Sequence, residues 1–187
     1  MKRLIIGLSG ADGVSIGVRL LHILHGLPGV ETHLVATPSA ERNLLLEGCP
    51  PLAGLRELAD FSYAADDMAA VIASGSFVTD GMIIAPCSMK TLAALASGYT
   101  DNLLQRAADV CLKEGRKVIL VPREMPLSRI HLRNMLTASE CGCTITPPVL
   151  TFYNKPRSVM DHVDHILGKA LLSLGIAMPS FRPWQGA

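Results

Sequence analysis

An arginine and a glutamate stand side by side directly after the most strand-like segment of the chain. Residues 117–121 carry a run of β-branched and aliphatic side chains that predicts a buried strand of a parallel sheet, and Pro122 ends it before Arg123 and Glu124. Ligands of open α/β sheets bind at the carboxyl ends of the strands, where these two side chains would lie. An always-charged guanidinium beside a titratable carboxyl suits a site that holds an anion and moves a proton. The dipeptide alone fits an ordinary surface ion pair better than a functional site. The choice between the two interpretations therefore depends on the rest of the chain.

Strands and helices are predicted to alternate along the rest of the chain. The hydrophobic patterns predict strands at residues 4–8, 31–36, 81–85, 117–121 and 144–146. They predict helices at residues 14–25, 38–47, 90–97, 101–113, 131–141 and 159–174, with short elements between 52 and 74. This alternation indicates an α/β fold, a doubly wound parallel sheet flanked by helices, in a single domain that spans residues 1–187.

The composition excludes several classes of protein. A formal net charge of +1 gives no basis for binding nucleic acid or an anionic membrane surface. No apolar run is long enough to span a membrane, and the first residues do not resemble a signal peptide. The five cysteines lack the spacing of a disulfide framework or a zinc site, so we expect reduced thiols in a cytoplasmic protein. An apolar fraction of 49% with 4% aromatic residues fits a protein that buries surface against other subunits.

Two loops between a predicted strand and a predicted helix offer backbone amides to a ligand. The first, SGADG at residues 9–13, lets amides approach a phosphate, but it lacks the GxGxxG fingerprint and plain turn chemistry explains it better. Asp12 in this loop would repel a phosphate unless its carboxylate points away. The second loop, residues 86–91, contributes the hydroxyls of Ser88 and Thr91, and Ser88 also suits a helix N-cap.

Other polar and aromatic residues give weaker patterns. Arg106 and Lys113 are seven residues apart and share a helix face, which fits anion binding and a solvated face about equally well. Phe152 and Tyr153 are adjacent in a polar loop that ends in proline, which slightly favours a binding wall over core. The six histidines form no HExxH pattern, so no metal site is expected among them.

Taken together, these segments resemble the flavin prenyltransferase family, the UbiX-like proteins. The resemblance covers nearly the whole chain in one order of blocks, which is more specific than any single motif. The blocks are GLSGADG at 7–13, SGSF at 74–77, PCSMKTL at 86–92, RAADVCLKEGRKVILVPREMPLS at 106–128, HLRNM at 131–135, PPVLTFYNKP at 147–156 and the terminal RPWQGA.

The resemblance implies a fold, an activity and partners. It implies a Rossmann-like, flavodoxin-related subunit that binds FMN non-covalently, needs no metal, and assembles into a homo-oligomer, commonly a dodecamer, with sites at subunit interfaces. The implied reaction joins the dimethylallyl group of dimethylallyl phosphate to N5 and C6 of reduced FMN. The product, prenylated FMN, serves a partner decarboxylase of aromatic or α,β-unsaturated acids.

The resemblance also implies roles for particular residues. Glu124 matches the carboxylate that accepts the C6 proton, Glu47 matches a second site carboxylate, and Tyr153 supplies a hydroxyl donor and a ring facing the allyl cation. Residues matching the FMN-binding positions are Gly10, Ala11, Asp12, Thr37, Ser88, Met89, Lys90, Thr91 and Arg123. Residues matching the positions that hold the substrate phosphate, which gains negative charge as it departs, are Arg106, Lys113, Arg123, Tyr153 and Lys169.

The sequence departs from the usual pattern of the family at a few positions. The family loop usually reads G-A-S/T-G, and Asp12 replaces its small hydroxyl residue, which is expected near flavin N5. Ile16 stands where many members have tyrosine, Thr37 where most have serine, and Lys169 where the family has a phosphate-binding arginine.

Asp12 therefore supports an alternative hypothesis, an FMN-binding paralogue without prenyl transfer. A flavin-dependent decarboxylase of peptidyl-cysteine type shares the broad fold, but the catalytic histidine and Asn-rich motif of such enzymes are not found. The sequence leaves open the downstream decarboxylase, the oligomer number and the choice between a mono- and a diphosphate donor.

Overall fold

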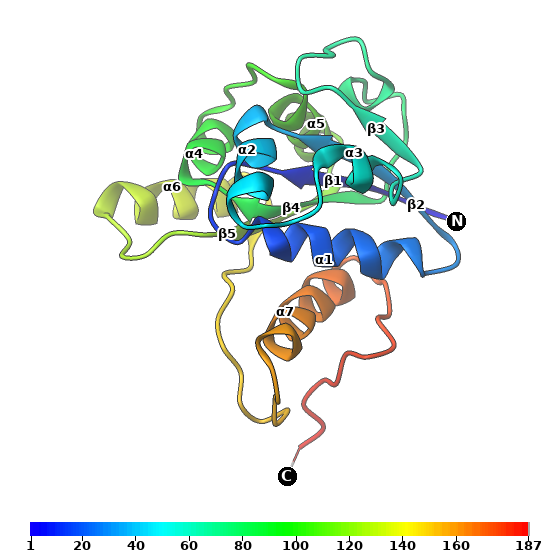
Figure 1. Cartoon of the computed structure of the whole chain (residues 1–187). Coiled ribbons are helices and arrows are strands. Elements are labelled where there is room, and N and C mark those ends of the chain that lie inside the picture. Colours follow the sequence, from blue (N-terminus) through cyan, green and yellow to red (C-terminus); the bar gives the residue numbers. More distant parts are fainter. Residues whose placement is uncertain (187) are drawn as a thin grey trace.

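A six-stranded parallel sheet forms the centre of the protein (Figure 1). The computed structural model describes residues 1–186. The strands are β1 (Lys2–Leu8), β2 (Val30–Ala36), β3 (Phe61–Tyr63), β4 (Gly81–Cys87), β5 (Lys117–Pro122) and β6 (Cys143–Ile145). Their order is β3-β2-β1-β4-β5-β6 and every neighbouring pair is parallel. This is the strand order of the Rossmann fold, so the predicted Rossmann-like α/β fold is confirmed.

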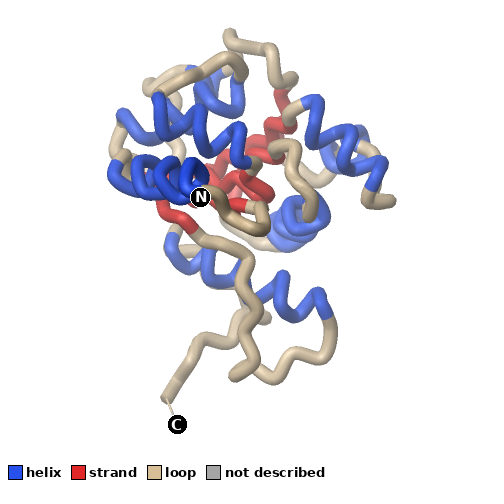
Figure 2. The backbone as a smooth tube through the Cα atoms, turned by 90° about the vertical axis from the view of Figure 1, so that its left-hand side faces the viewer, coloured by secondary structure: helices blue, strands red, loops and turns tan. Residues whose placement is uncertain are grey.

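Helices cover both faces of the sheet, and each face has its own hydrophobic core (Figure 2). One core joins the sheet to α1 (Val14–His25), α2 (Pro38–Leu46), α3 (Leu52–Arg56) and α7 (Val159–Ser173). The other joins it to η1 (Val71–Ala73), α4 (Met89–Ser97), α5 (Leu103–Lys113) and α6 (Arg129–Glu140). Within residues 1–186, no helix combines the length and apolar character needed to cross a membrane.

The predicted elements agree with the structure except in a few places. The short helix α3, the short strand β3 and the single 3₁₀ turn η1 lie in the stretch of residues 52–74, where only short elements were expected. The third predicted strand continues past residue 85 to Cys87. Pro86 is tolerated there because the pairing of β4 with β5 shifts register between Ile84 and Cys87, so the residue without an N–H lies where the ladder is interrupted.

The strand order places a crevice at the carboxyl edge of β1 and β4. After β1 the chain crosses to β2 on one side, whereas after β4 it crosses to β5 on the other side. The loops that leave the two central strands therefore diverge. In open α/β sheets the ligand binds in the crevice outside such a switch point.

Candidate functional site

The carboxyl edge of the sheet gathers the nine residues that the sequence predicted to bind FMN, together with the predicted base Glu124. Four neighbouring strands, β2, β1, β4 and β5, end there, and the predicted residues follow each strand directly. They are Thr37 after β2, Gly10, Ala11 and Asp12 after β1, Ser88, Met89, Lys90 and Thr91 after β4, and Arg123 and Glu124 after β5.

Ser9 joins the loops that follow β1 and β4. Its side chain is fully buried, and its hydroxyl donates to the backbone oxygen of Pro86 at 2.9 Å and accepts the amide of Ser88 at 2.7 Å. Both walls of the crevice are thereby fixed to each other. Sequence reasoning did not select Ser9. A hydroxyl directly after a buried strand, at the start of a glycine loop, is the signal that would have identified it.

Gly10 allows the β1 loop to approach the start of α2. A Cβ atom at position 10 would lie 2.2 Å from the Cβ of Ser39, a distance that no real contact allows. Gly13 ends the same loop with a φ of 83°, a left-handed conformation that glycine adopts without strain. The glycines of SGADG therefore serve close approach and backbone conformation.

Glu47 occupies the amino end of α1. Its carboxylate accepts the amides of Gly13 at 2.8 Å and Val14 at 3.1 Å through Oε1, and that of Ser15 at 3.2 Å through Oε2. The helix end that the glycine loop could have offered to a phosphate thus binds a carboxylate of the same chain. This contact makes Glu47 a positioning residue for the loop, and its predicted role as a second catalytic-site carboxylate stays a prediction.

The helices α2 and α4 also begin at the carboxyl edge. The Thr37 hydroxyl accepts the amide of Ala40 at 3.2 Å, and the Ser88 hydroxyl accepts the amide of Thr91 at 3.2 Å and donates to the Thr91 hydroxyl at 3.1 Å. The N-cap interpretation of Ser88 is therefore confirmed. Two helix dipoles direct their positive ends at this edge, which favours a negatively charged ligand group there.

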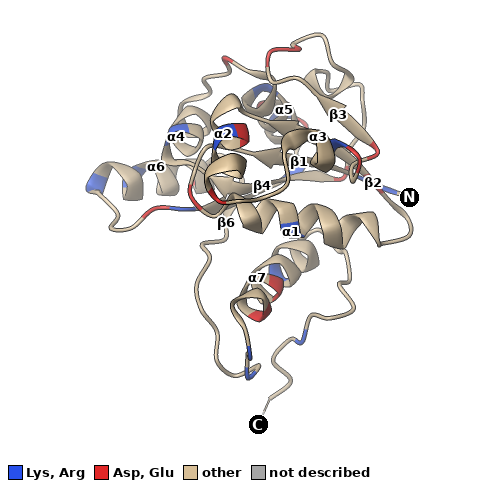
Figure 3. Ribbon diagram, viewed as in Figure 1, with Lys and Arg blue, Asp and Glu red and all other residues tan. Residues whose placement is uncertain are grey.

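Arg123 reaches across the crevice to Asp12. Its guanidinium lies 2.7 Å from the Asp12 carboxylate, while its backbone amide donates to the oxygen of Cys87 at 3.1 Å. Glu124 is exposed, and its carboxylate accepts the amide of Met125 at 3.0 Å. Acidic and basic residues lie side by side in the connection from β5 to α6 (Figure 3). The side chains of these two adjacent residues therefore have different surroundings: Arg123 pairs with Asp12, and Glu124 faces solvent.

The helix cations lie apart from this edge. Arg106 on α5 donates to the backbone oxygen of Ala73 at 3.2 Å and pairs with Asp109 at 2.8 Å. Lys113 ends α5 shortly before β5 begins, which places it at the amino edge of the sheet, where it pairs with Glu114. Within the described residues of one chain, neither Arg106 nor Lys113 shares a hydrogen-bond or ion-pair partner with Arg123.

Tyr153 and Lys169 belong to a third region, formed by α7 and the segments beside it. The loop of residues 146–158 runs away from the sheet, and α7 lies below it (Figure 1). The Tyr153 hydroxyl is 3.2 Å from Nε2 of His165, and its ring packs edge-on against Trp184 at 5.3 Å. Burial, assisted by the charge of Lys169, lowers the pKa of His165. From the sequence we expected only that the histidines form no metal site, so no functional role was assigned to His165.

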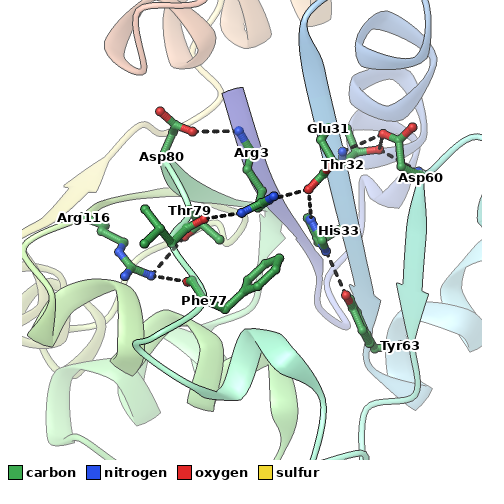
Figure 4. A network of polar contacts seen from close by, with 11 residues as sticks. Arg3, Glu31, Thr32, His33, Asp60, Tyr63, Phe77, Thr79, Asp80 and Arg116 are labelled. Atoms are coloured by element: carbon green, nitrogen blue, oxygen red, sulfur yellow. Dashed lines mark hydrogen bonds and ion pairs between the residues drawn. The ribbon is translucent and has the colours of Figure 1, made fainter. Parts of the chain in front are cut away.

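A partly buried polar network, centred on the buried His33, lies elsewhere in the sheet, near the amino ends of β1 and β2 (Figure 4). Glu31 pairs with Arg3, and its carboxylate lies 2.9 Å from Nε2 of His33. The other ring nitrogen of His33 is 2.9 Å from the Tyr63 hydroxyl, and Arg3 lies 4.5 Å over the ring of Phe77. Hydrogen bonds from His33 and Arg3 lower the pKa of Glu31, whereas burial lowers the pKa of His33.

The thiols and acidic groups give no second site. All five cysteines are free, and burial raises the pKa of Cys87 and raises that of Cys143 to about 11, so these two are unreactive. Among residues 1–186, no three histidine, cysteine, aspartate or glutamate side chains gather closely enough to hold a metal ion.

Comparison with known proteins agrees with this geometry. The Flavoprotein family model matches residues 1–171. The flavin prenyltransferase LpdB of Lactiplantibacillus plantarum is 50% identical over 186 residues, covering 100% of both chains. A crystal structure described as a dodecameric FMN-dependent UbiX-like decarboxylase from Escherichia coli O157:H7 matches with a TM-score of 0.95 and 52% identity, covering 98% of this chain and 100% of that one.

A second crystal structure, AnUbiX (PadA1) in complex with FMN and dimethylallyl pyrophosphate, matches with a TM-score of 0.96 and 45% identity, covering 100% of this chain and 98% of that one. These likenesses extend over the whole chain, in sequence and in fold. The protein therefore belongs to the UbiX-like flavin prenyltransferase family.

Proposed function

We propose that this protein is a flavin prenyltransferase that joins the dimethylallyl group of dimethylallyl phosphate to N5 and C6 of reduced FMN. The carrying observation is the crevice at the carboxyl edge, where a glycine loop, two helix N-termini and the residues Arg123 and Glu124 meet in a member of this family. In the proposed reaction the allylic C–O bond breaks, inorganic phosphate leaves, and the flavin gains one isoprene unit.

The backbone and the charge of the carboxyl edge suit FMN. The close approach of Gly10 to Ser39 leaves backbone rather than side chains along one wall, and the positive ends of α2 and α4 favour an anionic group. The residues that would hold FMN are Gly10, Ala11, Asp12, Thr37, Ser88, Met89, Lys90, Thr91 and Arg123. When bound, reduced FMN supplies the nucleophilic N5 and C6 atoms.

Glu124 is the proposed base. Its exposed carboxylate adjoins the crevice and makes a single contact among the described residues, to the neighbouring amide of Met125, so it is free to accept the C6 proton. Arg123 supplies a fixed positive charge beside it for the phosphate. Glu47 is a weaker candidate for the base because three backbone amides at the start of α1 already donate to its carboxylate.

The remaining substrate-binding residues require a second subunit. Arg106, Lys113, Tyr153 and Lys169 lie in regions that one chain keeps apart from Arg123, so we infer that copies of the chain contribute them to a shared phosphate site. Large exposed apolar side chains on and beside α6 and α7, including Ile130, Leu136 and Phe152, support such an assembly. We propose a dodecamer, as described for the relative from Escherichia coli O157:H7. Sedimentation of the purified protein would show about twelve times the mass of 20.0 kDa.

Three further proposals follow from the family. The reaction requires no metal, the protein acts in the cytoplasm, and prenylated FMN passes to a decarboxylase of aromatic or unsaturated acids. A chelator added to the assay tests the first of these, since it should leave the rate unchanged.

A mass spectrum of the flavin decides the main proposal. The purified protein is incubated anaerobically with reduced FMN and dimethylallyl phosphate, and the flavin is then released. The expected product is heavier than FMN by one isoprene unit. Unmodified FMN as the sole product would count against prenyl transfer. A parallel reaction with the diphosphate shows which donor is used.

The Asp12–Arg123 ion pair favours one alternative, an FMN-binding protein without transferase activity. The pair engages the arginine that the transferase reaction needs for an anion. In that case Asp12→Ser should create activity that the natural chain lacks. Activity of the natural chain in the same assay would exclude this alternative.

A further inference from the structure

The Asp12–Arg123 ion pair spans the crevice. Asp12 follows β1 and Arg123 follows β5, and β4 lies between these two strands in the sheet. Neighbouring strands are about 5 Å apart, so the pair bridges about 10 Å directly outside the carboxyl end of β4.

The backbone on both sides of the pair is fixed, so its rearrangement involves side chains alone. The amide of Arg123 is bonded to the oxygen of Cys87, and the amides that follow Asp12 are held by Glu47. The Asp12 side chain is 72% exposed and makes no other hydrogen bond or ion pair within residues 1–186. Such an exposed pair contributes little to stability and is readily exchanged for another anion.

We propose that Asp12 is an internal counter-anion that competes with the anionic group of the ligand for Arg123. This inference rests on the proposed function, because it assumes that Arg123 binds a ligand phosphate in the crevice. Asp12 thereby weakens the binding of phosphate-bearing ligands. A dianionic phosphate competes with the single carboxylate better than a monoanion does, so Asp12 favours phosphate esters over carboxylates.

The competition explains how the chain tolerates a carboxylate where its family has a hydroxyl. Without a partner, Asp12 would repel a phosphate in the crevice. Paired with Arg123, its charge is neutralised, and the energetic consequence for the ligand is limited to the exchange of one anion for another. Asp12 then acts as a specificity-determining residue and does not abolish ligand binding.

Phosphate titrations of the natural chain and three variants test the proposal. The dissociation constants of inorganic phosphate, and separately of FMN, are measured by calorimetry for the natural chain, Asp12→Asn, Arg123→Gln and the double variant. Asp12→Asn should bind phosphate up to about fivefold more tightly, the range expected for an exposed ion pair, and higher salt should shrink the gain. In the Arg123→Gln background the gain should shrink, because only direct repulsion between Asp12 and the phosphate then remains. Glu57→Gln, which removes an exposed charge before β3 at the amino edge, should change nothing.

The outcomes separate this inference from the proposed function. Unchanged or weaker phosphate binding by Asp12→Asn would overturn the inference, and so would an equal gain in the Arg123→Gln background, because Asp12 would then act by direct repulsion. Coupling between the two residues with no prenylated FMN from any variant would instead preserve the inference and reject the transferase.

Discussion

Two groups of charged side chains, near opposite ends of the strands, differ in how completely the protein satisfies them. In the network of Arg3, Glu31, His33 and Tyr63, each polar side chain has a partner from a neighbouring strand, and the ring of His33 is 1% exposed. At the carboxyl edge, Asp12 has one partner and Glu124 only the adjacent amide.

The difference indicates which ionised groups stabilise the fold and which remain available to bind a ligand. Buried groups must be paired because an unpaired polar group away from water is strongly unfavourable. Exposed groups remain solvated when their partner leaves, so they can exchange it for a ligand. We therefore expect substitutions in the network to change the free energy of unfolding, and substitutions at the edge to change ligand binding and rate.

The largest effect is expected for Glu124→Gln. Glutamine keeps the size of the side chain and its acceptor for the amide of Met125, but it cannot take up a proton. Formation of prenylated FMN, measured by mass, should slow by about 10²–10⁴-fold, the usual contribution of a general base. The melting temperature should stay unchanged. A rate within a few-fold of the natural chain would remove Glu124 from the reaction, and Glu57→Gln provides the matched control.

His33→Ala should have the opposite signature. The substitution leaves a cavity between the aromatic rings of Phe61 and Phe77. It also removes the hydrogen-bond partner of Tyr63 and one of the two partners of Glu31, which keeps Arg3. The free energy of unfolding, measured with denaturant, should fall by about 3 kcal/mol. The rate of the folded fraction should hardly change. His22→Ala, at an exposed position of α1, serves as the control and should be nearly neutral. A comparable loss of stability in both variants would show that the network contributes nothing specific.

Glu47→Gln tests whether a predicted site carboxylate is catalytic or positioning. Loss of the charge weakens the contacts to the three amides that begin α1, so the free energy of unfolding should fall by about 1 kcal/mol. A modest decrease in rate should accompany it, mainly as a weaker affinity for FMN. A rate loss as large as that of Glu124→Gln with unchanged FMN affinity would instead make Glu47 part of the proton chemistry.

The network should also make stability depend on pH. The pKa of His33 is lowered in the folded protein by burial. Below about pH 6.5 this histidine is therefore protonated in the unfolded chain while it is still neutral in the folded protein. The free energy of unfolding should therefore decrease as the pH falls through that range, by at most about 1.4 kcal/mol per pH unit, until the folded histidine also protonates. Denaturant titrations between pH 7 and 5 should show a smaller slope for His33→Gln. An identical slope would place the proton uptake on other groups, such as His165.

Much of the fold and part of the site were predictable from local patterns. The buried strand before Pro122 and the helix start at Ser88 follow from residue type and order, and the residues predicted to bind FMN follow four of the strands directly, as the sequence pattern led us to expect. The contact of Glu47 with the start of α1 and the Asp12–Arg123 pair were not predictable, because they join residues 34 and 111 positions apart whose meeting depends on the packed sheet. The positions of Lys113 and Arg123 at opposite edges of the sheet were predictable from the element order, because a helix that leads into a parallel strand ends at the amino edge.

The smallest effect is expected for Asp109→Asn on α5. Its pair with Arg106 spans one helical turn and both side chains are about one-third exposed, so stability should change by at most about 0.5 kcal/mol. If subunit contacts bring Arg106 to the substrate phosphate as proposed, release from Asp109 should lower the KM for dimethylallyl phosphate while kcat stays constant. A clear loss of stability with a constant KM would mean that this exposed pair stabilises the fold, as the partly buried network does. Burial would then not separate the charges that stabilise the fold from those that bind a ligand.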